Sequence, residues 1–173
     1  MLITEILARN ARVYGDEVAL IERDPVNSRR KEITWNDFDA AANRVANALL
    51  AKGIKKGDKV VHLLMNCIDW LPAYFGILRT GAWVVPLNFR FSADDIKLCT
   101  EIAEARALVF GEEFIGRVEQ IKTALDKTVA SYLFVGPEDM RPAFAEQYAD
   151  LLASASSEAP QVESELNDSA ALY

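Results

Sequence analysis

The chain has 173 residues, of which 51% are hydrophobic and 26% charged, a composition typical of a globular protein rather than a disordered one. Its formal net charge of -7 argues against non-specific binding to nucleic acid or to an anionic membrane. No apolar stretch reaches the ~20 residues that a membrane span requires, and the two cysteines fit neither a disulfide framework nor zinc spacing. We therefore expect a cytoplasmic protein with no nucleic-acid partner and no membrane span.

The first part of the chain predicts a helix, a hairpin and a second helix. Residues 3–13 have an amphipathic helical pattern, and short strands are expected over residues 18–22 and 31–34, separated by turn-forming residues. Thr34 is placed to cap a helix that continues to about residue 50, and Gly53 is placed to end it.

From residue 59 onwards, predicted strands alternate with predicted helices. The strands are expected over residues 59–65, 83–87, 107–110 and 129–135, and the helices over residues 68–78, 92–102, 114–125 and 142–152. Asn66 is expected to cap the first of these helices, and Ser92 the second, which would bury Ile96, Cys99 and Ile102. This alternation predicts an α/β domain over residues 1–152, built from right-handed βαβ units around a mainly parallel sheet.

The composition changes after residue 152. Residues 153–168 are rich in Ser, Ala and Glu, and no Lys or Arg follows Arg141, so we expect an acidic linker or surface strap. Residues 169–173 form an apolar run that resembles the beginning of a strand, with no turn or polar tail after it. We expect a chain truncated within this strand.

The residues that usually carry catalysis are not arranged for it in this sequence. His62 is the single histidine and lies in an apolar strand, where a structural role is favoured over catalysis. Cys67 is expected at a helix N-terminus, a position that lowers a thiol pKa, but no base is expected beside it. Asp94 and Asp95 are expected in the first turn of a helix, where carboxylates stabilise the helix dipole. We find no Ser/His/Asp triad, metal-ligand cluster or glycine-rich phosphate motif, so we predict no catalytic residue and no metal ligand.

Three stretches resemble the AMP-forming acyl-CoA synthetases of the adenylate-forming superfamily. The first combines residues 33–38 (ITWNDF) with residues 53–60 (GIKKGDKV). The second, residues 74–88 (YFGILRTGAWVVPLN), is the most specific and matches the family pattern G-x-x-(K/R)-x-G-A-x-x-x-P-L-N. The third, residues 168–173 (DSAALY), resembles the run that leads directly into the family's Thr-Ser-Gly-Thr-Thr-Gly phosphate loop. The resemblance identifies the chain as an N-terminal fragment that ends just before that loop.

The resemblance implies a two-step reaction for the parent enzyme. A carboxylate attacks ATP to give an acyl-adenylate and pyrophosphate, and coenzyme A (CoA) then displaces AMP to give a thioester, with Mg²⁺ assisting the first step. The parts that bind ATP, Mg²⁺ and the acid belong to sequence beyond Tyr173, so this fragment is expected to be inactive and to bind no cofactor firmly. Fatty acids are the commonest substrate class implied by such a resemblance.

One residue is a candidate for cofactor binding by resemblance. In some family members the arginine of an Asn-Pro-Arg segment contacts a phosphate of CoA, and Asn88-Phe89-Arg90 resembles that segment with Phe89 in place of proline. A guanidinium suits a phosphate because it offers a planar fork of donors and stays charged. A structural role for Arg90, in the surface loop before Ser92, is the alternative.

Other classes of function remain open from the residues alone. The main alternative is a free-standing α/β module that binds a partner without catalysis. A receiver-like signalling domain fits the strand–helix alternation, but Met65-Asn66 supplies no phosphoacceptor aspartate at the strand end. The expected partners of the fragment are the rest of the same enzyme chain and, in the parent, a small carboxylic acid. Truncation could also expose apolar surface and lead to self-association.

Overall fold

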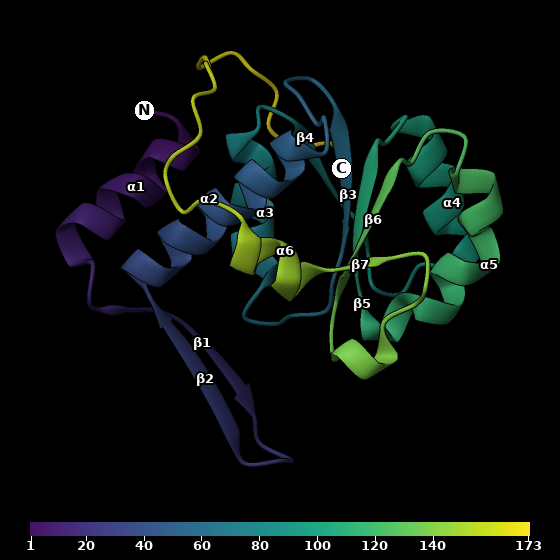
Figure 1. Ribbon diagram of the computed structural model, residues 1–173, viewed down its shortest axis with the longest axis horizontal. Helices are drawn as coiled ribbons and strands as arrows, with labels where there is room; N and C mark the ends of the chain where they lie inside the picture. The colour runs from purple at the N-terminus through teal and green to yellow at the C-terminus, as the bar shows by residue number, and fades with distance from the viewer.

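A computed structural model describes residues 1–173 as a parallel α/β domain with a projecting hairpin (Figure 1). The helices are α1 (Ile3–Tyr14), α2 (Trp35–Ala51), α3 (Trp70–Arg79), α4 (Ala93–Ile102), α5 (Ile115–Leu125) and α6 (Tyr148–Ser154), with short 3-10 helices η1 (Glu112–Phe114) and η2 (Glu138–Met140). The strands are β1 (Val18–Asp24), β2 (Arg29–Thr34), β3 (Lys59–Leu63), β4 (Trp83–Pro86), β5 (Ala107–Gly111), β6 (Ser131–Val135) and β7 (Glu146–Gln147). No helix is both long enough and apolar enough to cross a membrane.

The main sheet has five parallel strands in the order β4-β3-β5-β6-β7. Consecutive strand residues point to opposite faces, so Val60 contributes to the core on one face and Val61 to the core on the other. Helices α2, α3 and α6 cover the first face, and α4 and α5 cover the second (Figure 1). Because both faces are covered, the central strands are almost entirely buried, as parallel sheets require.

Helices α2 and α3 pack closely because Gly76 has no side chain. A Cβ atom at Gly76 would lie 2.4 Å from the Cβ of Val45 and 2.9 Å from the backbone oxygen of Ala42. The same helix is followed by Gly81, whose φ of +74° is readily adopted only by glycine. The two glycines therefore set how near α3 lies to α2 and where the chain leaves it for β4.

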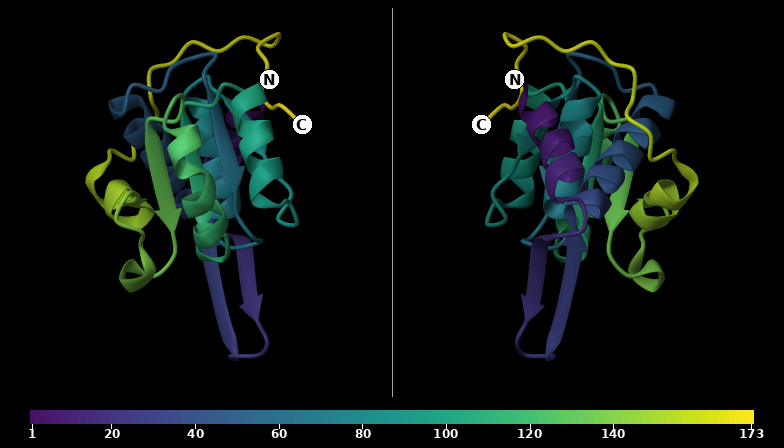
Figure 2. Two further views of the ribbon diagram at one scale, coloured as in Figure 1. Left: turned by 90° about the vertical axis from the view of Figure 1, so that its right-hand side faces the viewer. Right: turned by 90° about the vertical axis from the view of Figure 1, so that its left-hand side faces the viewer.

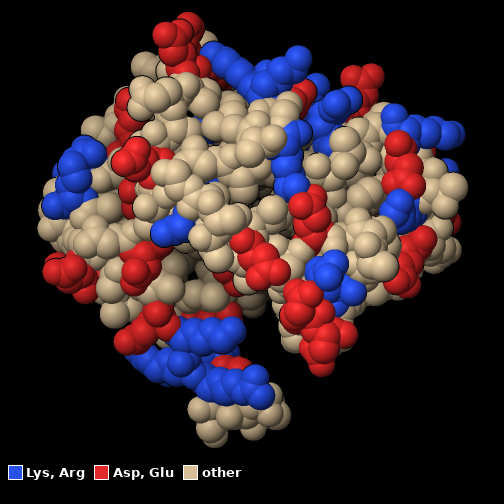
Figure 3. Space-filling model, viewed as in Figure 1, with Lys and Arg blue, Asp and Glu red and all other residues tan.

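The hairpin of β1 and β2 projects away from the body of the domain (Figure 2). Its strands pair antiparallel, with Glu22 opposite Lys31. At its base, Leu7 of α1 packs with Phe38 and Ala42 of α2 in a small core of its own. Lys and Arg side chains gather on the hairpin, although the chain as a whole is acidic (Figure 3).

Residues 153–168, here called the strap, cross the surface of α2 and are held there by hydrogen bonds from side chains. Asn43 and Asn47 donate to the carbonyl oxygens of Ser157 and Ser156, each at 2.8 Å. Near the end of the strap, Lys56 forms an ion pair of 2.7 Å with Asp168. Beyond it, Ala171 forms a single parallel bridge with Val84 at the free edge of β4.

The sequence predictions for the helix N-termini were partly correct. Thr34 and Ser92 both accept a hydrogen bond from the amide three residues on, at 3.1 and 3.2 Å, which confirms the two predicted caps. The cap predicted for Asn66 was wrong, since α3 begins at Trp70 after a loop.

Two further local predictions were wrong. Ile102 is 72% exposed, because the buried face of α4 follows Ala93, Ile96 and Thr100, and Ile102 lies well around the helix from it. The predicted helix over residues 142–152 begins only at Tyr148, because Glu146 and Gln147 form the short strand β7 beside β6.

Candidate functional site at the carboxyl edge of the sheet

A crevice of about 630 Å³ lies at the carboxyl edge of the parallel sheet. The chain passes from β3 to β4 on one side and returns to place β5 on the other, so the carboxyl ends of β3 and β5 form the point where the strand order reverses. In open parallel sheets such a point is the usual place for a ligand. Leu64 and Met65, after β3, and Gly111, at the end of β5, all line the crevice.

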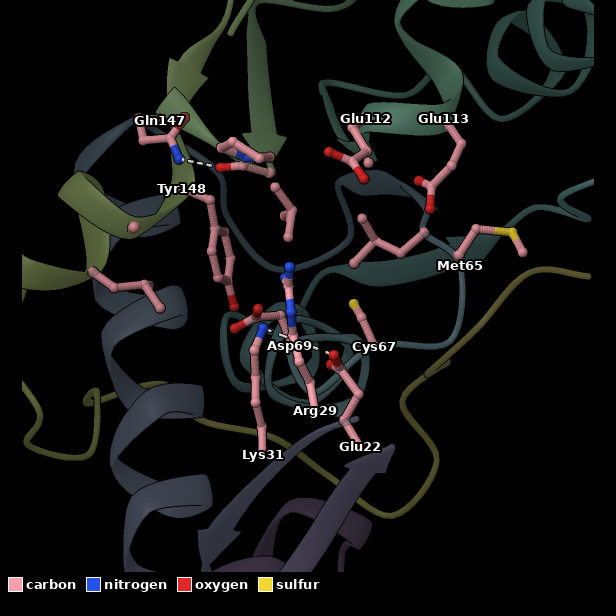
Figure 4. Close-up of a pocket in the computed structure, with 17 residues that line it drawn as sticks. Glu22, Arg29, Lys31, Met65, Cys67, Asp69, Glu112, Glu113, Gln147 and Tyr148 are labelled. Carbon is pink, nitrogen blue, oxygen red and sulfur yellow. Dashed lines mark hydrogen bonds and ion pairs between the residues drawn. The ribbon is translucent and has the colours of Figure 1, made fainter. Parts of the chain in front are cut away.

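The walls of the crevice come from five parts of the chain (Figure 4). The hairpin contributes charged side chains, the loop before α3 contributes a thiol and a carboxylate, and the segments after β5 and β6 and the start of α6 close the rest. The charged and polar lining residues are Glu22, Arg29, Lys31, Cys67, Asp69, Glu112, Glu113, Gln147 and Tyr148. The site therefore joins segments that are far apart in the sequence.

The hairpin is attached to this site by Glu22. One carboxylate oxygen of Glu22 accepts a hydrogen bond of 2.6 Å from the amide of Ile68, and the other lies 3.7 Å from Nζ of Lys31. Burial raises the pKa of the Asp69 carboxyl, with Lys31 acting to lower it and Glu22 acting to raise it further. Asp69 is thus a half-buried carboxyl group on which Lys31 and Glu22 act in opposite directions.

Gln147, at the end of β7, and Tyr148, the first residue of α6, each carry a buried polar atom that has no hydrogen-bond partner. Tyr148 is only 4% exposed, its hydroxyl has no hydrogen-bond partner, and that hydroxyl points into the crevice (Figure 4). Burial, followed by the charge of Asp69, raises the pKa of Tyr148 well above its ordinary value, so the hydroxyl keeps its proton. The side-chain amide of Gln147 donates to the carbonyl of Gly136 at 2.7 Å, which leaves its oxygen without a donor.

The thiol of Cys67 stays protonated in this setting. Burial raises its pKa to about 11, so the protonated form dominates at neutral pH. The helix N-terminus that was expected to lower this pKa begins three residues later, at Trp70.

His62 has the structural role that the sequence predicted. It is 1% exposed, and its Nε2–H donates to the carbonyl of Trp70 at 3.0 Å, which fixes the tautomer. Burial lowers its pKa to about 4, and its Nδ1 has no partner. The imidazole is therefore neutral at physiological pH and ties β3 to the start of α3.

Arg90 lies at the same carboxyl edge, in the loop after β4. Its backbone amide donates to Oδ1 of Asn88 at 2.9 Å, and its guanidinium lies 5.3 Å from the ring centroid of Phe89. The side chain is exposed and forms no ion pair within the chain. The positive charge of Arg90 is therefore exposed and is not paired with a carboxylate of this chain.

Arg117 of α5 holds this loop, and its role was not predicted from the sequence. Its Nη1 donates to the carbonyl oxygens of Phe89 at 2.9 Å and Phe91 at 2.7 Å, on either side of Arg90. No sequence pattern predicts this contact, because it joins residues that are 26 and 28 positions apart in the chain.

Metal ligands do not gather anywhere in the chain. No group of three or more His, Cys, Asp or Glu residues is placed to hold a metal ion. Asp95 instead accepts from Oγ of Ser92 at 2.7 Å within the cap of α4, as expected for a first-turn carboxylate.

Comparison with known proteins places this geometry in a family. The family model described as "AMP-binding enzyme" matches residues 7–173. The chain is 34% identical, over 71% of its length, to a 3-hydroxybenzoate–CoA/4-hydroxybenzoate–CoA ligase of Thauera aromatica, and 28% identical, over 76%, to the long-chain-fatty-acid–CoA ligase FadD13 of Mycobacterium tuberculosis.

A solved structure shows where the chain fits within such proteins. The inhibitor-bound N-terminal domain of FACL13 from Mycobacterium tuberculosis superposes with a TM-score of 0.81 and 27% identity, covering 96% of this chain and 39% of that domain. Against the two ligases, the chain spans only 23% and 24% of their length.

Proposed function

The chain belongs to the AMP-binding enzyme family, and from this premise we propose that it is the N-terminal portion of an AMP-forming acid–CoA ligase. The observation that carries the proposal is the family match over residues 7–173, together with relatives that are CoA ligases. The parent enzyme would join a carboxylic acid to CoA through an acyl-adenylate, with release of AMP and pyrophosphate. The chain alone would be inactive, because it brings together no nucleophile and base and no metal-ligand group.

Within that reaction, Arg90 would bind a phosphate of CoA. Its exposed guanidinium forms no ion pair within the chain, and the loop that carries it is fixed at Phe89 and Phe91 by Arg117. A planar, permanently charged fork of donors is well matched to a phosphate group. CoA itself would supply the thiol that displaces AMP, and the role of this chain would be to anchor its nucleotide end.

We propose that ATP and Mg²⁺ are bound by other parts of the parent enzyme. The chain has no glycine-rich phosphate loop, and no carboxylate group is placed to hold a metal ion. We therefore derive no phosphoryl step from this chain and assign both groups to other parts of the parent.

The acid is proposed only as a class. The named relatives act on hydroxybenzoates and on long-chain fatty acids. A fatty acid is our first candidate, and an aromatic acid is the alternative that these relatives support equally. We further propose that the parent is cytoplasmic, that this chain's main partner is the rest of the same enzyme, and that the isolated chain self-associates.

The test of the proposal compares CoA with 3′-dephospho-CoA as substrates of the full-length enzyme that contains this chain. Arg90→Ala should raise the KM for CoA by about tenfold or more, as expected for loss of a charge-assisted hydrogen bond, while leaving carboxylate-dependent ATP–pyrophosphate exchange unchanged. The substitution should have much less effect on 3′-dephospho-CoA if the 3′-phosphate is the group bound.

Two further measurements separate this proposal from a non-catalytic module. The reading frame after Tyr173 should continue into Thr-Ser-Gly-Thr-Thr-Gly, and a gene product without ATP–pyrophosphate exchange for any carboxylic acid would contradict a ligase. Residues 1–173 alone should show no exchange, and exchange above background would mean that they contain a complete site.

A further inference from the structure

We propose that the crevice between the ends of β3 and β5 binds a small primary alkylammonium ion, held by the hydroxyl of Tyr148 and the carboxylate of Asp69. Arg90 is not among the residues that line this crevice, and the proposal goes beyond the ligase reaction proposed above. The two groups come from α6 and from the loop before α3, and their polar ends point toward one another across the crevice (Figure 4).

The first argument is the unsatisfied polar atoms. A buried hydroxyl or amide oxygen without a partner costs about 1–3 kcal/mol, so native proteins rarely leave one. Tyr148, at 4% exposure, and Gln147, at 8%, each leave such an atom, and both residues line the same crevice. A ligand that donates hydrogen bonds to them would remove that cost.

The second argument is charge. Four carboxylates line the crevice, namely Glu22, Asp69, Glu112 and Glu113, against two cations, Arg29 and Lys31. Lys31 lies 3.7 Å from Glu22 and also acts on the half-buried Asp69, but no cation of the chain lies within ion-pair distance of the Asp69 carboxyl. The crevice therefore favours a cation.

The third argument decides which kind of cation. These carboxylates are not grouped so as to hold a metal ion, which leaves an organic cation. An ammonium group that carries N–H bonds can donate to Tyr148 and Asp69 together, whereas a quaternary ammonium cannot donate at all. The apolar side chains of Leu64, Val135 and Leu152, which also line the crevice, are suited to an alkyl chain attached to that group.

The test titrates residues 1–173 with butylammonium and follows backbone amide resonances. We expect saturable shifts confined to residues 64–69, 111–113 and 147–149. Butyltrimethylammonium and 1-butanol, which lack either the N–H donors or the charge, should bind at least about tenfold more weakly, as expected for the loss of hydrogen bonds between charged groups.

A pair of matched variants tests the assigned residue. Tyr148→Phe removes only the hydroxyl and should weaken butylammonium binding by about fivefold or more, and Asp69→Asn should weaken it further. Tyr132→Phe is the control, because the Tyr132 hydroxyl donates to Asp126 and lies outside the crevice. Circular dichroism would verify that each variant is folded.

Three outcomes would overturn the proposal. These are no saturable shift at the crevice, equal binding of butyltrimethylammonium, or unchanged binding in a folded Tyr148→Phe variant. None of these measurements uses CoA, ATP or turnover, so a failure here is distinct from a failure of the ligase proposal.

Discussion

Nη1 of Arg117 donates a hydrogen bond of 2.7 Å to the carbonyl oxygen of Phe91, and this contact fixes the loop that carries Arg90. A second bond of 2.9 Å to the carbonyl of Phe89 holds the other side of the loop. We expect Arg117→Ala to loosen the loop and to speed amide hydrogen exchange at Arg90 and Phe91 by about fivefold or more, since each lost hydrogen bond contributes about 1 kcal/mol.

The same substitution distinguishes positioning from binding in the parent ligase. Because Arg117 acts through the loop backbone, Arg117→Ala should raise the KM for CoA while leaving ATP–pyrophosphate exchange unchanged. Its effect should largely disappear in an Arg90→Ala background, since the two residues act as a unit. Additive effects on KM would show that Arg117 does not act through Arg90.

Gly76 allows the second testable prediction, on stability. A methyl group at Gly76 would lie 2.4 Å from the Cβ of Val45, so Gly76→Ala should push α3 away from α2. Overpacking of this kind costs about 1–3 kcal/mol in the free energy of unfolding, measured by urea denaturation.

Gly116 provides the matched control within the same chain. It lies in α5, and no atom lies within 4 Å of the place that an added methyl group would take, so Gly116→Ala should be neutral or should stabilise the protein by about 0.5 kcal/mol. If the two substitutions changed stability equally, close packing between α2 and α3 would not be the role of Gly76.

Features with a local physical cause could be predicted from the sequence. The caps at Thr34 and Ser92 depend on residues three positions apart, and the parallel sheet follows from the alternation of short apolar strands with helices. By contrast, the prediction for residues 142–152 was wrong because pairing of Glu146 and Gln147 with β6 outweighs their local helical pattern.

The candidate site was harder to predict, because its residues meet only through the fold. Arg90 could be found by resemblance, but its partner Arg117 lies on another element, with no spacing that signals the contact. Tyr148 likewise lies in no sequence motif that would mark it, and its significance comes from a buried hydroxyl that points toward Asp69 in the crevice.

The strap gives a third prediction, on local opening. Nη1 of Arg44 donates to the carbonyl oxygens of Leu152 at 3.2 Å and Ala155 at 2.7 Å, at the point where the strap leaves α6. Arg44→Met should therefore increase the rate of cleavage after Glu158 by a glutamyl endopeptidase about fivefold, since cleavage requires the strap to detach. Arg9→Met, on the exposed side of α1, should leave that rate unchanged.

His62 provides the last prediction, on pH. Its pKa is about 4 in the folded protein, because burial disfavours the charged form, and about 6.5 in the unfolded chain. Between these values the unfolded chain binds more protons than the folded protein, so stability rises with pH across this window. As the pH falls from 6.5 to 4, this one group should cost the folded state about 3 kcal/mol, and above pH 6.5 it should contribute no pH dependence.

The contribution of His62 can be isolated with His62→Gln, which keeps an N–H donor for the carbonyl of Trp70 but does not titrate. Urea unfolding at half-unit steps from pH 4 to 8 should give a shallower slope for the variant than for the wild type between pH 4 and 6.5, and parallel curves above it. Other titrating groups, such as Asp69, are common to both proteins and cancel in the difference. Parallel curves over the whole range would mean that the buried imidazole accepts a proton in the folded state as readily as in the unfolded chain.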